Sequence, residues 1–87
     1  MTTLIIKEQV QNYNNWKTVF DSQHNLRVEY GEKTERIYRE NEHPNNMVIM
    51  LEWENEKKAK QFTKSKELKD ALDKSGVIGK PNMYFVE

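Results

Sequence analysis

The order of helical and extended patterns along these 87 residues predicts an α+β fold of the ferredoxin-like βαββαβ type. Three observations lead to it. Two long stretches with helical periodicity each follow an asparagine, extended segments lie around them, and a short turn sequence joins the two central extended segments. We therefore expect a single domain over residues 1–87, with one four-stranded antiparallel sheet and helices on one face.

The first half of the chain predicts a strand followed by a helix. Residues 4–10 form the strand, because apolar side chains recur there on alternate positions. Asn12 and Asn14 are both suitable N-caps for the helix that follows. The helix is expected to run to about Tyr30, with Gly31 as its C-terminal stop.

The remaining three strands are predicted from shorter signals. Residues 32–40 form the second strand, and the turn at 43–46 contains a proline and two asparagines. The strand at 47–53 follows at once, so the two strands make a hairpin. Near the end, 79–82 is expected to be a loop because it holds a glycine, a proline and an asparagine, and 83–86 is the closing strand.

A second helical region begins at Asn55, which caps it, and continues to Lys74. Its apolar face does not stay in register, because Leu68 falls about 120° away from Phe62 on a helical wheel. We expect a break near Ser65 that divides this region into two short helices.

The strand at 47–53 is apolar on both of its faces. Its odd-numbered residues form one continuous apolar face, while Val48 and Met50 lie on the other. Helices of the same chain can cover only one face, and a chain of this size has a thin core. The second face therefore predicts a partner subunit, which makes a homodimer the expected assembly.

Composition excludes several classes of partner. The net charge is zero, with 14 basic and 14 acidic side chains, so nucleic acid and anionic membranes are not expected partners. There is no cysteine to form a disulfide or bind a metal. The longest apolar run, 47–51, is far too short to cross a membrane. The first residues do not resemble a signal peptide, and a cytoplasmic location is expected.

The first helix carries polar residues inside its apolar face. Gln23 and Arg27 lie within the apolar arc, and His24 lies at its rim. An unpaired buried guanidinium is very costly, so Arg27 needs a carboxylate, a route to solvent, or a polar cavity. Glu52 and Glu67 are possible partners for an ion pair. A ligand pocket between helix and sheet is the alternative, and His24 is either a surface residue or a catalytic one.

Other chemistry-bearing residues have ordinary interpretations beside functional ones. Four aromatic residues are either core and interface side chains or stacking platforms for a ligand: Trp16, Tyr38, Trp53 and Phe62. The lysines at 57–69 alternate with acidic residues, which indicates a solvated helix face. The two histidines have no metal-binding spacing, and we expect neither a metal nor a cofactor.

A series of short motifs resembles the antibiotic biosynthesis monooxygenase-like (ABM) family, within a short subgroup of mostly uncharacterised proteins. In chain order the motifs are Asn12-Tyr13-x-x-Trp16-x-x-Val19-Phe20-Asp21, His24-x-x-Arg27-x-x-x-Gly31, Arg36-x-Tyr38-Arg39, Pro44-Asn45, Leu51-Glu52-Trp53, Ala59-x-x-Phe62-x-x-Ser65-x-x-Leu68 and Gly76-Val77-x-Gly79-x-Pro81. The resemblance covers nearly the whole chain. It implies a dimeric α/β barrel, in which two sheets pack face to face and cover Val48 and Met50.

The resemblance implies a function as well as a fold. Characterised members include cofactor-independent oxygenases that act on polycyclic phenolic compounds, and such an enzyme needs an apolar pocket with groups that deprotonate the substrate and stabilise its anion. The residues proposed for catalysis are His24 and Arg27, and those proposed for binding an aromatic or polycyclic molecule are Trp16, Gln23, Tyr38 and Trp53. Tyr38 is also a suitable type for the polar chemistry. The alternative is a non-catalytic homodimer that binds or responds to a small molecule.

The haem-degrading branch of the same family fits less well. It uses a helical tryptophan and a haem-ligating histidine in the second helical region. At the aligned positions this chain has Phe62 and Leu72, neither of which can bind iron. Haem degradation is therefore not expected.

Overall fold

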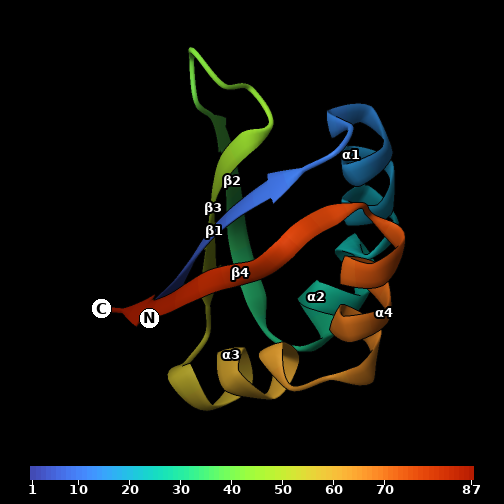
Figure 1. The fold of residues 1–87 in the computed structure, drawn as a ribbon. Coiled ribbons are helices and arrows are strands. Elements are labelled where there is room, and N and C mark those ends of the chain that lie inside the picture. Colours follow the sequence, from blue (N-terminus) through green and yellow to red (C-terminus); the bar gives the residue numbers. More distant parts are fainter.

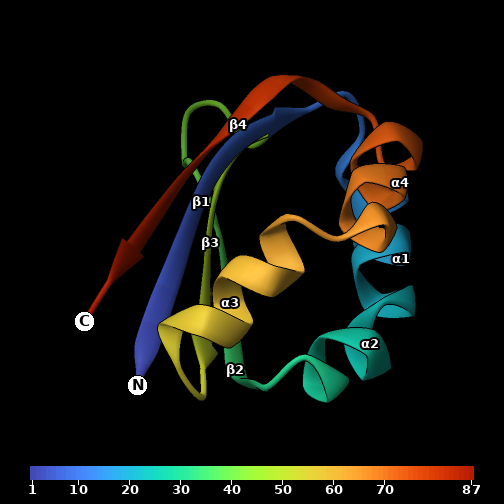
Figure 2. The ribbon, with the colours of Figure 1, turned by 90° about the horizontal axis from the view of Figure 1, so that it is seen from below.

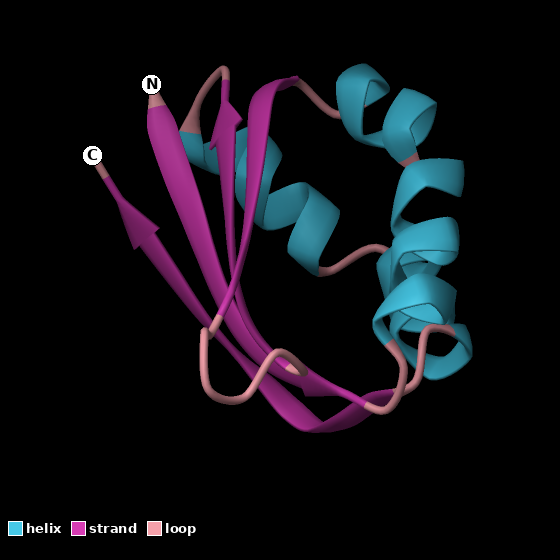
Figure 3. Ribbon diagram, turned by 90° about the horizontal axis from the view of Figure 1, so that it is seen from above, coloured by secondary structure: helices cyan, strands magenta, loops and turns pink.

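The computed structural model describes residues 1–87, and its elements follow the predicted order with each helical region divided in two (Figure 1). They are β1 (Thr2–Val10), α1 (Tyr13–Ser22), α2 (His24–Glu29), β2 (Glu32–Arg39), β3 (Asn46–Trp53), α3 (Glu56–Thr63), α4 (Lys66–Lys74) and β4 (Val77–Val86). The sheet is antiparallel, with the strand order β2-β3-β1-β4. All helices lie on one side of it (Figures 2 and 3), so the predicted ferredoxin-like α+β fold is confirmed. None of the helices is both long and apolar enough to span a bilayer.

The core lies between the inner face of the sheet and the helices. In β3 the odd-numbered residues are at most 2% exposed, whereas Val48 and Met50 on the other face are only half-buried. The predicted two-faced character of this strand is therefore present in the fold. The buried cluster comprises Leu4, Ile6, Val10, Trp16, Met47, Ile49, Leu51, Trp53, Ala59, Phe62 and Leu68.

The first helical region does not run unbroken to Tyr30, and the prediction of one helix is wrong. Asn12 caps α1 as expected, accepting a hydrogen bond from the backbone N–H of Asn15. The break lies at Gln23, whose backbone departs from helical angles and whose N–H donates to the carbonyl of Phe20 at 3.2 Å. That tighter bond ends α1, and α2 begins at the next residue, His24.

The second helical region is divided where the sequence predicts. Asn55 caps α3, because its side chain accepts from the N–H of Lys58 at 2.9 Å. Ser65 lies between the helices with an extended backbone, and its hydroxyl accepts from the N–H of Leu68 at 3.2 Å. The serine therefore begins α4 as an N-cap, which explains the change of apolar register.

The predicted loop at 79–82 is instead part of β4, which begins six residues earlier than expected at Val77. The strand tolerates Pro81 because β4 is at the edge of the sheet, where a missing N–H is permitted. Gly79 has a φ of +71°, which favours glycine, and the β1–β4 register shifts between Lys7 and Gln9. Turn-forming residues here make a bulge within a continuous strand.

The outer face of the sheet has no helix over it (Figure 3). Strand register brings several apolar side chains together on this face, and all of them are half-buried or exposed: Ile5, Tyr38, Val48, Met50, Tyr84 and Val86. This surface is the one for which the sequence predicts a partner subunit.

Candidate functional site

A small apolar cavity lies between the inner face of the sheet and the helices. Its volume is about 40 Å³, which is room for about two water molecules. Eleven of the 15 residues around it are hydrophobic. The full set is Ile6, Glu8, Trp16, Val19, Phe20, Gln23, Arg27, Ile49, Leu51, Phe62, Leu68, Ala71, Leu72, Ser75 and Met83.

Glu8 is the acidic residue of this cavity, and β1 places it there. Strand alternation directs it to the same face as Leu4 and Ile6. The indole Nε1–H of Trp16 donates to Oε1 of Glu8 at 3.0 Å. The other carboxyl oxygen, Oε2, is buried and has no hydrogen-bond partner.

The surroundings of Glu8 change its proton affinity. Burial raises the pKa of the Glu8 carboxyl to about 7, although the hydrogen bond from Trp16 acts to lower it. The group can therefore take up or release a proton near neutral pH, as a general acid or base must.

Glu8 is not among the site residues predicted from the sequence. The signal was nonetheless available: in the strand 4–10, Leu4, Ile6 and Val10 share one face, and Glu8 is the one charged residue at that parity. Charged side chains are rare on inward-facing strand positions unless a partner or a function requires them. Such a break in alternation is what sequence reasoning could have used.

Arg27 is fully enclosed, with 2% of its side chain exposed, and three oxygens hold it. Its Nε donates to Oε2 of Glu32 at 2.8 Å, and Nη2 donates to Oε2 of Glu35 at 2.9 Å. Nη1 donates to the carbonyl of Phe20 at 2.7 Å, next to the helix break. The guanidinium therefore closes a structural ion cluster and also ties down the end of α1.

The predicted partners of Arg27, Glu52 and Glu67, are wrong. The Glu52 side chain accepts instead from the Thr34 hydroxyl, and Glu67 contributes only its backbone carbonyl to another residue. The reason lies in chain connection: only two residues separate α2 from β2, so the first acidic residues of β2 meet Arg27 directly.

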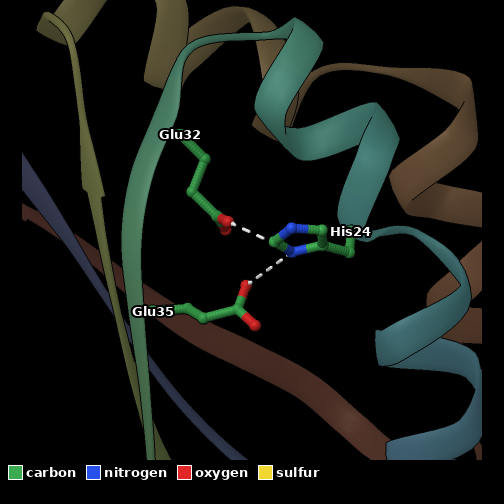
Figure 4. Close-up of side chains that lie close together, drawn as sticks. All are labelled: His24, Glu32 and Glu35. Atoms are coloured by element: carbon green, nitrogen blue, oxygen red, sulfur yellow. Dashed lines mark ion pairs between the residues drawn. The ribbon is translucent and has the colours of Figure 1, made fainter.

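His24 lies next to the carboxyl groups of Glu32 and Glu35 (Figure 4). Its Nδ1 lies 3.5 Å from Oε2 of Glu35 and 4.0 Å from Oε1 of Glu32, while 54% of its side chain is exposed.

Two carboxyl groups face one guanidinium, so the cluster favours an additional proton. Burial and the hydrogen bond with Glu35 raise the pKa of Glu32. Burial also acts to raise the pKa of Glu35, but hydrogen bonds with Glu32 and Arg27 outweigh it and lower that pKa.

His24, Glu32 and Glu35 are the residues that could hold a metal ion, since their ligand atoms lie within 4.8 Å of one another. Arg27, however, already occupies one oxygen of each carboxyl group. Its fixed positive charge also disfavours a cation at this position. We therefore interpret the group as an ion cluster.

The structure divides the six predicted site residues into two groups. Three line the cavity: Trp16, Gln23 and Arg27. The other three do not. His24 lies outside at the ion cluster, and Tyr38 lies on the opposite face of the sheet. Trp53 is buried against Phe62, with ring centroids 5.0 Å apart, and its Nε1 has no hydrogen-bond partner.

The helical wall of the cavity is held by a few specific contacts. The Trp16 and Phe20 rings stack with centroids 4.8 Å apart, and the Arg27 guanidinium lies 3.7 Å from the centroid of Phe20. The side-chain amide of Gln23 donates to the backbone carbonyl of Glu67 at 3.0 Å, which joins the α1–α2 junction to α4.

Comparisons with known proteins find similar solved structures but no similar sequences. No protein-family model matches the sequence, and no curated protein is significantly similar to it. A provisionally assigned antibiotic biosynthesis monooxygenase from Bordetella bronchiseptica aligns with a TM-score of 0.82 and 14% identity, over 99% of this chain and 94% of that chain. A conserved protein from Methanosarcina mazei Go1 aligns with a TM-score of 0.77 and 17% identity, over 98% and 89% of the chains.

A third similar structure is SnoaB, a cofactor-independent oxygenase from Streptomyces nogalater. It aligns with a TM-score of 0.76 and 11% identity, over 99% of this chain and 92% of that chain. At these identities the likeness shows the fold. The chain has the ABM fold over nearly its whole length, as the sequence resemblance implied.

Proposed function

We propose that this chain is a cofactor-independent, monooxygenase-like protein that binds a small aromatic molecule in the cavity between α1 and the sheet. The observation that carries the proposal is the composition of the cavity: an apolar lining interrupted by four polar side chains, Glu8, Gln23, Arg27 and Ser75. Ligand sites for apolar molecules have this character. The fold, which it shares with an oxygenase that needs no cofactor, supports the same reading.

The chemistry would combine dioxygen with an aromatic carbon acid, or with a phenol, whose keto tautomer carries the reacting CH₂ group. Removal of a proton from a CH₂ group leaves a carbanion, which transfers an electron to dioxygen, and recombination forms a C–O bond. Protonation gives a hydroperoxide. Loss of water, with the second C–H proton, leaves a carbonyl, so that one CH₂ group and one O₂ become one C=O group and one H₂O. An apolar cavity suits both the neutral substrate and dioxygen.

The cavity must enlarge before an aromatic molecule can enter. Its volume of about 40 Å³ is far below the roughly 300 Å³ at which small-molecule pockets begin. The wall side chains Phe20, Leu72 and Met83 are only half-buried, so they can move with less loss of packing than the core. We expect the opening at the helical wall, where Gln23 holds α4.

A homodimer is part of this proposal. Its interface would be the uncovered outer face of the sheet, where Tyr38 and Tyr84 are each 49% exposed. Contiguous apolar surface of this kind is unusual on a protein that acts as a monomer. Pairing two such faces would give the barrel that the sequence resemblance implies.

A second candidate function is a non-catalytic homodimer that binds or responds to a small molecule. The observation that favours it is the saturation of Arg27, whose guanidinium donates to three oxygens of the protein itself. A positive charge so neutralised offers little stabilisation to a substrate anion.

Oxygen uptake and ligand-dependent melting distinguish the two functions. Anthrone in air-saturated buffer is the substrate probe, and 1-naphthol is the binding probe. Consumption of dioxygen with formation of anthraquinone supports the oxygenase. A melting shift with 1-naphthol and no oxygen uptake with anthrone supports the binding protein. The absence of both responses would contradict both functions.

A further inference from the structure

We propose that Glu8 is the catalytic base of this cavity, and that the site takes a neutral aromatic molecule whose acidic O–H or C–H group lies against Oε2 of Glu8. This inference rests on the proposed function, since it assigns the proton-accepting step of that site. Neither the sequence motifs nor the structural comparisons point to Glu8.

Glu8 differs from the other polar groups of the cavity because one of its atoms is left free. Gln23 and Ser75 both donate to backbone carbonyls of α4, and Arg27 is held by its ion cluster. Glu8 is the only acidic residue in the lining, and its buried Oε2 has no partner. A buried polar atom without a hydrogen bond is costly, so its retention calls for a partner from outside the chain.

The geometry fixes one oxygen of Glu8 and leaves the other available. Trp16 is 3% exposed, and its Nε1–H holds Oε1 at 3.0 Å. Such a bond orients the carboxyl group before a ligand arrives, which is the arrangement expected of a positioned general base. Because Trp16 also lines the cavity, a ligand on Oε2 would contact the indole ring as well.

Glu8 also has a route for returning its proton to solvent. It lies where the β1–β4 register shifts between Lys7 and Gln9. It borders both the apolar cavity and an open polar groove of about 570 Å³, which Lys7, Arg39, Glu40 and Lys80 also line. The charged groups around Glu8 are therefore Arg27 on the cavity side and, in the groove, the cations Lys7, Arg39 and Lys80 with the carboxyl group of Glu40.

The proposed step is a simple proton transfer. The carboxylate Oε2 forms an O–H bond as the substrate O–H or C–H bond breaks, and the electron pair stays on the substrate as its anion. The anion then reacts with dioxygen as described above. The protonated Glu8 returns the proton to the peroxide or, through the groove, to water. Burial raises the pKa of Glu8 to about 7, so near neutral pH the carboxylate is both present and basic.

The test compares the Glu8→Gln variant with wild type and with Glu42→Gln, an exposed control in the β2–β3 connection. Glutamine keeps an oxygen for Trp16 but cannot accept a proton. Anthrone oxidation should fall by at least about 100-fold in Glu8→Gln. In wild type and Glu42→Gln the rate should rise with pH through about 7. Unchanged turnover with an unchanged pH profile in Glu8→Gln would overturn the assignment.

Binding of 1-naphthol separates failure of this inference from failure of the proposed function. If wild type binds 1-naphthol with a pH inflection near 7 that Glu8→Gln lacks, but does not oxidise anthrone, Glu8 contacts the ligand and the oxygenase function with its catalytic base is overturned. If both proteins oxidise anthrone equally, the oxygenase stands and Glu8 is not its base. Glu8→Asp retains a carboxyl group, so it should keep the pH inflection of 1-naphthol binding while its oxidation activity falls. This variant replaces Glu8→Gln in the test if Glu8→Gln fails to fold.

Discussion

The indole Nε1–H of Trp16 donates to Oε1 of Glu8 at 3.0 Å, and this bond joins the first helix to the first strand beside an apolar cavity. Through this contact Trp16 satisfies its only polar side-chain atom, whereas Oε2 of Glu8 has no hydrogen-bond partner. The pair therefore both fastens α1 to the sheet and leaves a reactive oxygen in the interior.

The first prediction concerns stability against pH. The folded pKa of Glu8, about 7, is above its ordinary value of 4.5, so the folded protein binds this proton more tightly than the unfolded chain does. The stabilisation from Glu8 is complete below about 4.5 and is lost as pH rises through about 7. The total change is about 3 kcal/mol, and Glu8→Gln should remove it.

Urea denaturation at pH about 5 and about 8 measures this effect as the difference between Glu8→Gln and wild type. Subtracting the unfolding free energy of one protein from that of the other cancels the contributions of Glu32 and Glu35, because both proteins contain these residues. Equal pH dependence in the two proteins would contradict the raised pKa.

The second prediction concerns the buried ion cluster. Arg27→Met should lower the free energy of unfolding by about 3–5 kcal/mol, because it leaves the Glu32 and Glu35 carboxyl groups without their partner. Arg27→Met combined with Glu32→Gln should be less destabilised than the sum of the single variants. Guanidinium denaturation measures each protein, and additive losses would show that the two side chains do not interact.

The third prediction concerns His24, which the sequence suggested as a catalytic residue and the structure places at the surface. His24→Ala should change the unfolding free energy by less than about 1 kcal/mol, because an exposed ion pair contributes little. Anthrone oxidation should remain close to the wild-type rate. A large loss of turnover with normal stability would return His24 to the list of catalytic residues.

The fourth prediction concerns assembly. Light scattering of the wild type should give about twice the 10.5 kDa chain mass. A Val48→Lys, Met50→Lys double variant should give the monomer mass, because two lysines would be buried where the sheets pack. Lys57→Glu, on the exposed helical side, is the matched control and should remain a dimer. A wild type that is monomeric at micromolar concentration would contradict the expected interface.

The fifth prediction concerns entry into the cavity. Gln23→Ala removes the hydrogen bond to the Glu67 carbonyl at the helical wall, so 1-naphthol should bind faster while the unfolding free energy falls by about 1 kcal/mol. Asn15→Ala is the control, because it removes a comparable bond between α1 and the Lys74 carbonyl away from the cavity. Stopped-flow fluorescence measures the rates, and equal acceleration in both variants would argue against a specific opening at Gln23.

Much of the fold could be predicted because its signals are local. Asn12, Asn55 and Ser65 cap helices through bonds to residues three positions ahead, and such bonds depend only on the adjacent sequence. Apolar residues at both odd and even positions of 47–51 similarly identify a strand with two apolar faces. The bulged β4 was missed because Gly79 and Pro81 have the same local preferences in a loop and in a distorted edge strand.

Local patterns were thus sufficient to predict the order of strands and helical regions, the cap Asn55, a cap at Asn12 or Asn14, the break near Ser65 and the two faces of the central strand. Local patterns did not contain the partners of Arg27, the position of His24 outside the cavity, or the unpaired Oε2 of Glu8. These features depend on packing, because atoms from other elements set the desolvation and hydrogen bonding of a charged group. The alternation in β1 marks Glu8 as an inward-facing charge, but its raised pKa comes from burial by the elements packed around it.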